Sequence, residues 1–504
     1  MCGIAGIIGN HERREIVGML RALRHRGPDG TGIFHDGDCS LGHVRLSIID
    51  VAGGSQPIFN ETGDRCIVFN GEIYNYRELR KRLGHHRFRT ASDTEVILHL
   101  YEDLGPACVR ELDGMFAFAI WDRGGLFLAR DPIGIKPLYL GKRGGTRYFA
   151  SEIKALLSCE TIEVFPPGHY FTPEGGLQTY EAWEIAPRPS NDIPSLLKEI
   201  RDTLEQAVRK RLVADVPVGV FLSGGLDSSL VAALARPHVK RLSTFSVGMA
   251  GAPDLPFARQ VAKALGTDHH ERVYTAEEVR GALVRVIRHL ESFDAPLVRS
   301  AIPCFFVAEL ARRHDIKVIQ TGEGADELFS GYDYLKRIPG DEALGRELSA
   351  ITFALHHTNL QRADRATMVH GVEGRVPFLD KAMIRLGLGI SPSLKRVTSE
   401  RPEKWLLRKA FDGMLPPEVL WRTKQKFSEG AGSMHLLEYL ADETVDEKTF
   451  RRERRLPDGT MLRSREELMY YRIFREHFPH AQYVRLMGRT ASYERKGDSV
   501  NPSV

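Results

Sequence analysis

The chain changes character at residues 186–195, and this change constrains the fold more than any other feature. The segment reads APRPSNDIPS, whose three prolines and few apolar residues are typical of a linker. Short β-type runs dominate before it, whereas strands alternate with helices after it. We therefore expect one domain over residues 1–185, a second over 196–490, and a flexible tail over 491–504.

The first part predicts layered sheets with few helices, an α+β domain. Its apolar runs of strand length lie at 3–8, 66–69, 115–121, 126–129 and 148–150, and its two helical segments at 12–24 and 94–102.

The second part predicts a parallel, doubly wound α/β sheet, because strands and helices alternate along it. The expected strands are 216–222, 242–247 and 318–321, and the expected helices are 195–212, one from 228, 255–265 and 276–291. From about residue 344 the pattern is mostly helical.

Composition excludes several classes of protein. The 504 residues include 70 Lys and Arg against 66 Asp and Glu, so the net charge of +4 favours neither a nucleic-acid nor a membrane partner. No apolar run approaches the ~18 residues that a transmembrane helix needs. The apolar segment at the start of the chain lacks the basic residues that precede the apolar part of a signal peptide. The six cysteines lack the paired spacing of a disulfide framework. We expect a cytoplasmic protein.

Cys2 is the most informative single residue. If Met1 is trimmed, Cys2 carries both a thiol and a free α-amine, and an amine with a pKa of about 7.7–8 can activate the thiol. The alternative is a buried cysteine that begins an apolar strand, and position alone does not decide between the two.

Four further features favour a reactive Cys2. They are the charged loop 24–30 (RHRGPDG), Arg45, the strand end 70–75 (NGEIYN), and Asp93 beside a helix start. Each alone is explained by a loop, a surface cation, a turn or a helix cap. Together they supply a cation for an α-carboxylate, acids for an α-ammonium, and an amide with a Gly N–H for an oxyanion.

This set resembles the N-terminal-nucleophile (αββα) glutaminase domain of class II glutamine amidotransferases, over residues 2–180. The resemblance implies that Cys2 is the nucleophile and that Asn70 and Gly71 form the oxyanion hole. Arg45 would hold the glutamine carboxylate, and Glu72 with Asp93 its amino group. The implied glutamine-binding set is Arg45, Leu46, Ser47, Ile48, Asn70, Gly71, Glu72 and Asp93.

A second motif, SGGLDSS at 223–229, follows an expected strand and begins a helix. Its glycines, hydroxyls and helix N-terminus favour a polyanion, although the turn could also be a plain one. It lacks the Lys-Ser/Thr ending of a Walker A loop. It resembles the pyrophosphate-binding loop of enzymes that split ATP into AMP and pyrophosphate.

The acidic loop GEGADE at 322–327 follows the strand 318–321. Loops at the carboxyl ends of parallel strands can face one crevice, so Asp227 and Asp326 are candidates to hold one Mg2+. Taken alone, Asp326 would be a helix-start carboxylate. Segments 375–380, 403–404 and 421–428 add cations that could offset charge on a phosphate, or could simply be solvated.

With both halves in order, residues 2–478 resemble the glutamine-hydrolysing asparagine synthetase family. This implies a glutaminase that releases ammonia, an internal tunnel, and a synthetase domain that converts aspartate and ATP with Mg2+ into β-aspartyl-AMP and then asparagine. It also suggests a homodimer.

The resemblance implies further roles. Asp227 and Asp326 would bind Mg2+, Glu323 would act at the adenylate as acid/base or electrostatic partner, Lys424 would stabilise the pentavalent phosphorus, and Arg299 would bind aspartate. The implied ATP-binding residues are Phe221, Leu222, Ser223, Gly224, Gly225, Asp227, Ser228, Val247, Thr321 and Gly322.

Departures from the family leave an alternative open. The residues before Arg299 are Pro-Leu-Val where the family often has a threonine pair, and Thr321 and Ala325 replace common serines. The alternative is a ligase of the same mechanism that acts on another carboxylate. Cys2 and Glu323 argue against a β-lactam synthetase, which lacks the thiol and carries a tyrosine at the second position. The intact set of site residues argues against a non-catalytic descendant.

Overall fold

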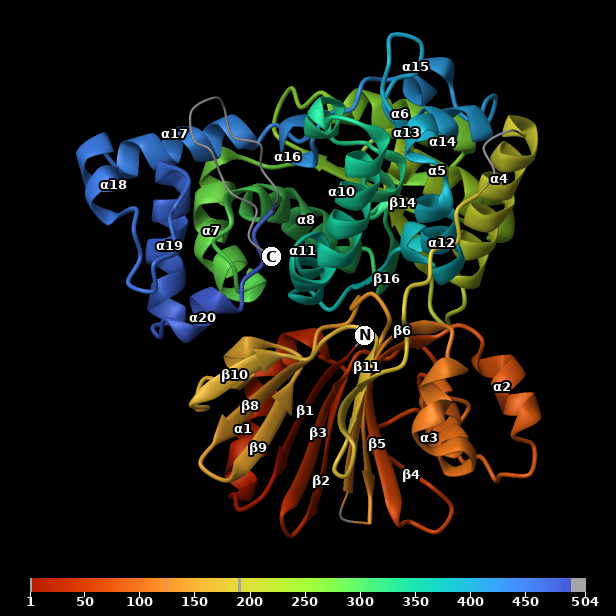
Figure 1. Ribbon diagram of the computed structural model, residues 1–504, viewed down its shortest axis with the longest axis vertical. Helices are drawn as coiled ribbons and strands as arrows, with labels where there is room; N and C mark the ends of the chain where they lie inside the picture. Colours follow the sequence, from red (N-terminus) through yellow and green to blue (C-terminus); the bar gives the residue numbers. More distant parts are fainter. Residues whose placement is uncertain (1, 124, 189–191, 491–504) are drawn as a thin grey trace.

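Two antiparallel sheets stack face to face in the N-terminal half of the computed structural model, which describes residues 2–123, 125–188 and 192–490 (Figure 1). The first sheet has the order β10(Thr161–Val164), β8(Tyr139–Arg143), β9(Thr146–Ala150), β1(Gly3–Ile8), β3(Cys39–Arg45), β2(Gly30–Asp36). The second has the order β12(Gly176–Thr179), β11(His169–Thr172), β7(Gly125–Arg130), β6(Gly114–Asp122), β5(Arg65–Ile73), β4(Ile58–Phe59).

Strand β6 explains the longest apolar run of this half. Its small residues Ala117 and Ala119 pack between the sheets, whereas Phe116 and Phe118 pack under the outer helices. Successive side chains of a strand point to opposite faces, so a strand buried on both faces must be apolar throughout.

Helices cover the outer face of each sheet. Helix α1 (Arg13–Leu23) packs on the first sheet, and α2 (Tyr76–Arg82) and α3 (Asp93–Leu104) lie on the second. Ser92 caps α3 by accepting a hydrogen bond from the Thr94 N–H, so Asp93 is the first helical residue rather than the residue before the helix. The four layers confirm the αββα expectation.

The C-terminal half is built on a five-stranded parallel sheet. Its order is β15(Asp268–Val273), β14(Ser243–Gly248), β13(Val218–Phe221), β16(Val318–Gln320), β17(Glu373–Arg375). Helices pack on both faces, which confirms the doubly wound α/β fold. The sequence pattern did not reveal β15 or β17, because β15 is a half-exposed polar edge strand and β17 has three residues.

Helices make up most of this half, and they include the expected helical region after residue 344. They are α4(Ile193–Lys210), α5(Leu226–Ala235), α6(Asp254–Leu265), α7(Ala276–Leu290), α8(Ala295–Arg313), α9(Ala325–Phe329), α10(Asp341–Phe353), α11(Asn359–Met368), α12(Lys381–Gly389), α13(Pro392–Lys395), α14(Trp405–Ala410), α15(Pro417–Leu420), α16(Phe427–Gly430), α17(Met434–Thr444), α18(Glu447–Glu453), α19(Arg465–His477) and α20(Gln482–Arg485). No helix in the described ranges has the length and apolar character needed to cross a bilayer.

The expected linker and tail are only partly described. Helix α4 begins at Ile193 with Asp192 as its cap, so the end of the expected linker 186–195 is helical. Residues 189–191 of the linker and the expected tail 491–504 lie outside the described residues.

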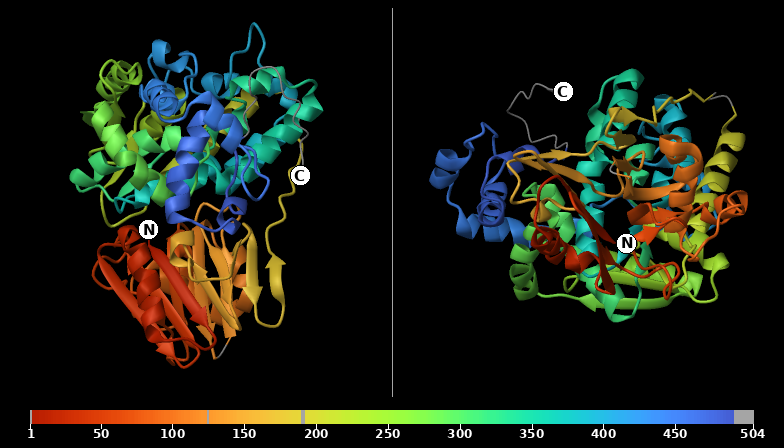
Figure 2. Two further views of the ribbon diagram at one scale, coloured as in Figure 1. Left: turned by 90° about the vertical axis from the view of Figure 1, so that its left-hand side faces the viewer. Right: turned by 90° about the horizontal axis from the view of Figure 1, so that it is seen from below.

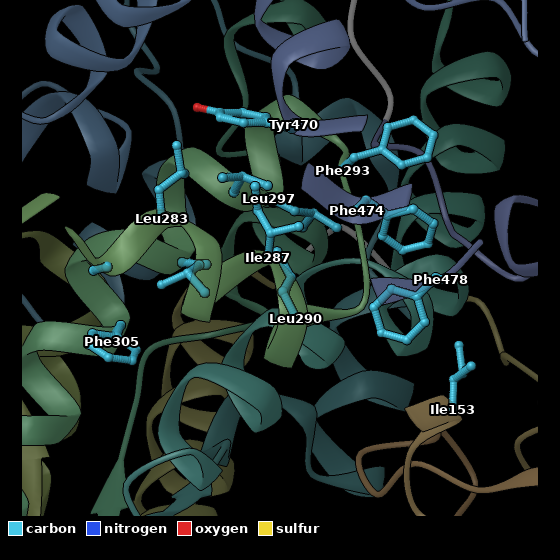
Figure 3. Close-up of a cluster of buried hydrophobic side chains, with 14 of the residues drawn as sticks. Ile153, Leu283, Ile287, Leu290, Phe293, Leu297, Phe305, Tyr470, Phe474 and Phe478 are labelled. Carbon is cyan, nitrogen blue, oxygen red and sulfur yellow. The ribbon is translucent and has the colours of Figure 1, made fainter. Parts of the chain in front are cut away.

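The largest hydrophobic core ties the two halves together (Figure 3). Aromatic residues of α19 and of the segment before α8 pack against aliphatic residues of α7, and Ile153 joins them from the N-terminal half. The central members are Leu283, Ile287, Leu290, Phe293, Phe474 and Phe478. The stacking of the two halves is visible in Figure 1 and in the left view of Figure 2.

Candidate active sites

Cys2 directly precedes β1, at the junction of the two halves, and is buried. Its backbone nitrogen donates to Oδ1 of Asn70 at 3.1 Å, and its Sγ lies 3.9 Å from the carbonyl oxygen of Leu46. Burial raises the pKa of the thiol. The Asn70 Nδ2 is buried and has no hydrogen-bond partner among the described residues, so it can donate to an incoming oxygen.

Gly71 follows Asn70 in β5, where the strand runs closely along β6. A Cβ at position 71 would come within 2.1 Å of the Met115 carbonyl oxygen, so the strand pairing admits only glycine. Asn70 and Gly71 therefore keep a fixed position relative to Cys2.

Arg45 ends β3 and is buried. Its guanidinium donates to the carbonyl oxygens of Asp50 at 2.6 Å and Val51 at 3.1 Å, with no carboxylate among its described partners. The loop after β3 also holds Ser47, whose N–H donates to Asp29 at 2.8 Å. The loop thus orients a cation whose charge is not neutralised by a bonded acid.

Glu72 and Asp93 are the buried acids of this site that the sequence predicts. Asp93 Oδ2 accepts a hydrogen bond from the Ile73 N–H at 3.0 Å. Burial raises the pKa of Asp93 to about 6, and burial together with the neighbouring Glu373 carboxylate raises the pKa of Glu72 well above its usual range. Arg375 lies 3.3 Å from Glu72. Sequence reasoning missed Glu373, since no local pattern places β17 of the third sheet beside Cys2.

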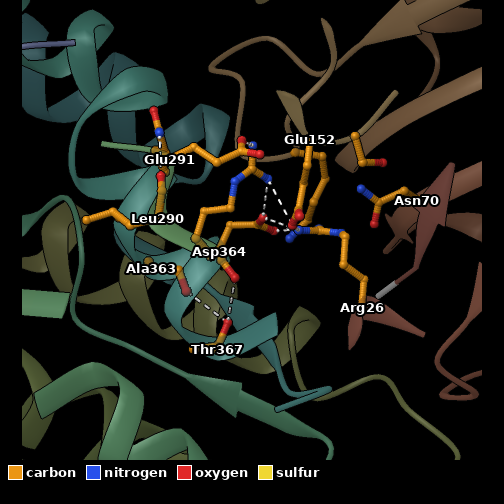
Figure 4. Close-up of polar contacts among 12 residues, drawn as sticks. Arg26, Asn70, Glu152, Leu290, Glu291, Ala363, Asp364 and Thr367 are labelled. Atoms are coloured by element: carbon orange, nitrogen blue, oxygen red, sulfur yellow. Dashed lines mark hydrogen bonds and ion pairs between the residues drawn. The ribbon is translucent and has the colours of Figure 1, made fainter. Parts of the chain in front are cut away.

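A buried ion network fastens this site to the C-terminal half (Figure 4). Arg26 Nε donates to the carbonyl oxygen of Cys2 at 3.0 Å, and its Nη1 lies 2.7 Å from Glu152 and 2.8 Å from Asp364 on α11. Arg365, also on α11, lies 3.4 Å from Glu152. Arg26 therefore connects the backbone of Cys2 to α11, through one hydrogen bond to Cys2 and one ion pair with Asp364.

The second site is a cavity of about 690 Å³ at the carboxyl ends of β13 and β16. Most of the ATP- and aspartate-site residues expected from the sequence line it: Phe221, Leu222, Ser223, Gly225, Asp227, Ser228, Val247, Arg299, Thr321, Gly322, Glu323, Asp326 and Lys424. Gly224 is not among the lining residues. Its φ of 73° and a Cβ position 2.4 Å from the Ala258 nitrogen show that it lets the loop turn against α6.

The two predicted loops meet in this cavity. A Cβ on Gly322 would lie 2.7 Å from the Cβ of Asp227. Lys404 Nζ joins the acids of both loops, at 2.6 Å from Asp227 Oδ2 and 2.5 Å from Asp326 Oδ1, and Lys424 Nζ lies 2.7 Å from Asp326 Oδ2. Two acids and two lysines therefore alternate around one point.

Mutual attraction favours the charged forms of Asp326 and Lys424. Burial alone would raise the pKa of Asp326, but the ammonium groups of Lys404 and Lys424 hold it below its usual range. Burial would lower the pKa of Lys424, whereas Asp326 and Asp227 raise it. Oδ1 of Asp227 is buried and accepts no hydrogen bond from any described residue, which leaves a hard oxygen ligand available to Mg2+.

Lys404 was identified from the sequence only as one of several nearby cations. Lys404 contacts Asp227, which lies 177 residues earlier in the chain. Glu403, the neighbour of Lys404, accepts a hydrogen bond from the Lys424 N–H at 3.0 Å. Residues 403 and 404 thus help to position both Lys404 and Lys424. Only the tertiary fold brings these residues next to the loops that carry Asp227 and Asp326.

Glu323 and Arg299 are both paired with other residues in the cavity wall. Glu323 lies 2.6 Å from Arg362 of α11, a cation that sequence reasoning missed. Arg299 donates to Glu466 at 2.9 Å and lies 3.1 Å from Glu438. A substrate carboxylate at Arg299 would therefore compete with two acids.

Comparisons with known proteins agree with this architecture. The fold and its two sites define an amidotransferase ligase of two parts. A family model described as a glutamine amidotransferase domain matches residues 1–179. A second model, described as asparagine synthase, matches residues 199–348 and 336–496. Asparagine synthetase [glutamine-hydrolyzing] of Triphysaria versicolor is 41% identical over 509 residues, which cover 95% of this chain and 86% of that protein. Asparagine synthetase [glutamine-hydrolyzing] 3 of Arabidopsis thaliana is 42% identical over 516 residues, which cover 95% and 88%. The chain belongs to the glutamine-hydrolysing asparagine synthetase family.

Proposed function

We propose that this enzyme hydrolyses glutamine to glutamate and ammonia, activates aspartate with ATP as β-aspartyl-AMP and pyrophosphate, and joins ammonia to the adenylate to give asparagine and AMP. The observation that carries the proposal is the presence in one chain of a buried Cys2 fixed to Asn70 and a separate cavity with alternating acids and lysines. The first suits acyl transfer from an amide, and the second suits a polyphosphate with a divalent cation.

At the first site, Cys2 Sγ attacks the glutamine carboxamide carbon. The thiol proton passes to the Cys2 nitrogen, which is an α-amine once Met1 is removed, and then to the departing ammonia. Asn70 Nδ2 and the Gly71 N–H stabilise the oxyanion, and water then hydrolyses the thioester to glutamate. Arg45 holds the glutamine carboxylate.

The two buried acids of this site hold the other end of the zwitterion. Asp93, assisted by Glu72, attracts the α-ammonium group of glutamine, and burial in this pocket raises the pKa of each carboxyl. Leu46, Ser47 and Ile48 complete the expected glutamine-binding set. Ammonia then crosses the junction between the halves, which the Arg26 network and α11 build.

At the second site, the loop 223–229 and the N-terminus of α5 bind the phosphates. Asp227 and Asp326 would hold Mg2+, which neutralises phosphate charge when bound. Lys404 and Lys424 then face the phosphates, where Lys424 stabilises the negative charge at the pentavalent α-phosphorus. The aspartate β-carboxylate oxygen attacks this phosphorus and pyrophosphate leaves.

Glu323 and Arg299 complete the chemistry of the second site. Glu323, positioned by Arg362, accepts a proton as ammonia attacks the adenylate and AMP leaves. Arg299 binds the aspartate carboxylate by displacing Glu438 or Glu466. We further propose that the domains span residues 1–185 and 196–490, and that the enzyme is a cytoplasmic homodimer. All six cysteines are buried and unpaired, which supports a reducing compartment.

One incubation tests this proposal. The enzyme is mixed with ATP, Mg2+, aspartate and glutamine, and asparagine, glutamate and AMP are measured by mass spectrometry. Asparagine and AMP in equal amounts, both lost without aspartate, are the expected result. Glutamate without asparagine or AMP would refute aspartate as acceptor and support the alternative, a ligase that acts on another carboxylate.

A further inference from the structure

Two histidines and two glutamates meet on the outer layer of the N-terminal half, away from both sites described above. Glu61 comes from the loop before β5, His86 from the loop after α2, and His99 and Glu102 from α3. One ligand atom of each lies within 4.8 Å of the other three. We propose that these four side chains form a structural Zn2+ site.

The distances among the ligand atoms suit a small tetrahedral ion. His99 Nδ1 lies 2.7 Å from Glu102 Oε2 and 3.5 Å from Glu61 Oε2, and His86 Nδ1 lies 3.2 Å from Glu61 Oε1 and 3.9 Å from Glu102 Oε2. Zinc bonds of about 2.0–2.1 Å at tetrahedral angles separate the ligand atoms by about 3.4 Å. The observed distances lie on both sides of this value, and the two distances to Glu61 reach different oxygens of its carboxylate. The imidazole rings of His86 and His99 are stacked, with centroids 4.4 Å apart and planes 23° apart, so one ring must rotate before both Nδ1 atoms point at one ion.

The second ring nitrogen of each histidine faces a carboxylate. His86 Nε2 lies 3.0 Å from Asp103 Oδ1, and His99 Nε2 lies 3.6 Å from Glu95 Oε1. Metal-bound histidines commonly donate their other N–H to a carboxylate, which fixes the tautomer and the ring orientation. Nδ1 is therefore the ligand nitrogen that each histidine offers to the cluster.

The two glutamates are also held from outside the cluster. Glu102 Oε1 accepts a hydrogen bond from Asn60 Nδ2 at 2.7 Å, and Glu61 Oε1 accepts one from the Arg87 N–H at 2.8 Å. Each carboxylate therefore has a fixed direction and keeps lone pairs for a cation.

The chemistry of the four ligands selects among cations. Imidazole nitrogens and carboxylate oxygens in a four-ligand set suit Zn2+, whereas Mg2+ and Ca2+ prefer oxygen alone and higher coordination. The His99 side chain is fully buried, those of His86 and Glu102 are 13% exposed and that of Glu61 is 30% exposed, so the protein encloses the site on the side of His99 and leaves Glu61 nearest to solvent. Four protein ligands define a closed structural site rather than a catalytic one.

A bound ion would join three separate segments. It would connect the loops that carry Glu61 and His86 to α3, whose first residue, Asp93, belongs to the glutamine site. His99 follows Asp93 by six residues, about 9 Å along the helix. Zinc would therefore stabilise the helix layer beside the glutaminase centre without contacting substrate.

The test is a titration of the chelator-treated, full-length enzyme with Zn2+ in the presence of excess Mg2+. We expect one Zn2+ per chain by calorimetry, a higher Tm that is reversed by chelation, and a tetrahedral visible spectrum with Co2+. His86→Gln and His99→Gln each remove a ligand and are expected to weaken binding by at least about 100-fold. Asp103→Asn removes the outer partner of His86 and is expected to weaken binding less, by about 10–100-fold.

Two controls test whether Zn2+ binds at another histidine or at a thiol instead of at this site. His435 is exposed and faces Glu438 at 3.4 Å with the same i, i+3 spacing as His99 and Glu102, so His435→Gln should leave Zn2+ affinity unchanged. Cys2→Ala should leave the stoichiometry at one, because none of the four proposed ligands is a cysteine.

Three results would overturn the proposal: no saturable Zn2+ binding, equal affinity in His86→Gln and His435→Gln, or an octahedral Co2+ spectrum. Circular dichroism of each metal-free variant establishes that it is folded. If His99→Gln does not fold, His86→Gln, at a partly exposed position, decides the outcome.

Discussion

The two sites use the same acidic residue types in opposite electrostatic settings. Beside Cys2, burial raises the pKa of Asp93 to about 6, and burial with Glu373 raises that of Glu72. In the cavity, Lys404 and Lys424 lower the pKa of Asp326. A buried pocket in which the carboxyls of Glu72, Asp93 and Glu373 lie close together favours a ligand that carries an ammonium group. A cavity in which acids and lysines alternate favours a polyphosphate together with a metal ion.

The two sites also differ in the structural elements that hold their residues in place. The Cys2 site is built on paired strands and is joined to α11 through buried Arg26, whereas the cavity is built from loops at strand ends. The difference predicts that each half-reaction can be removed separately. Four changes test this comparison, in order of decreasing effect.

Cys2→Ala is expected to abolish glutamate release, by at least about 10³-fold, because no other group can form the thioester. Asparagine synthesis from free ammonia should continue, since the cavity does not use the thiol. Paired assays of glutamate and of ammonia-dependent asparagine measure both effects. Cys39→Ala, at a buried cysteine of β3, is the control. Loss of both activities in Cys2→Ala would contradict the separation of the sites.

Lys424→Ala should lower AMP formation by about 10²-fold, the size of effect seen when one transition-state donor is removed. Glutamine hydrolysis without ATP should be unchanged. Pyrophosphate exchange with aspartate and ATP measures the first effect. Lys409→Ala, at a half-buried lysine 3.8 Å from Asp412, should behave as wild type. An equal loss in both variants would refute the role of Lys424.

Lowering the pH should weaken glutamine use before adenylate formation. The pKa of Asp93 is raised to about 6, so its carboxylate is charged above that pH and neutral below it. Attraction for the α-ammonium is therefore present above pH 6 and lost as the pH falls through it. We expect kcat/KM for glutamine to decline about tenfold per unit below pH 6. Asp93→Asn should lower it at pH 7.5 and displace this limb, and an unchanged profile would contradict the assignment.

Asp364→Asn should have the smallest effect on either activity and a clear effect on stability. It leaves the buried Arg26 with Glu152 alone, and breaking a buried pair costs up to about 3–5 kcal/mol. We expect Tm to fall by several degrees in thermal unfolding. Asp202→Asn breaks an exposed pair with Lys198 and should leave Tm unchanged. Equal Tm values in the two variants would show that the network contributes little.

Much of the fold follows from local patterns. Helix α7 was expected at 276–291 and spans Ala276–Leu290, since it has a clear apolar face and a Thr275/Glu278 capping box. Strand β15 was missed because its sequence, DHHERV, is polar, and its β pairing depends on β14. The loops of Asp227 and Asp326 were placed together by the rule for parallel strands, and the structure has them in contact.

The sequence by itself determined which chemistry the chain offers: a cysteine at position 2, an amide and a glycine at 70–71, and two acidic loops after strands. Only the tertiary structure decided the partners, such as Lys404 between Asp227 and Asp326 and Arg299 against Glu466. The reason is physical. Turn and helix preferences depend on neighbours in the chain, whereas burial and Coulomb interactions depend on groups that are distant in sequence and adjacent in space.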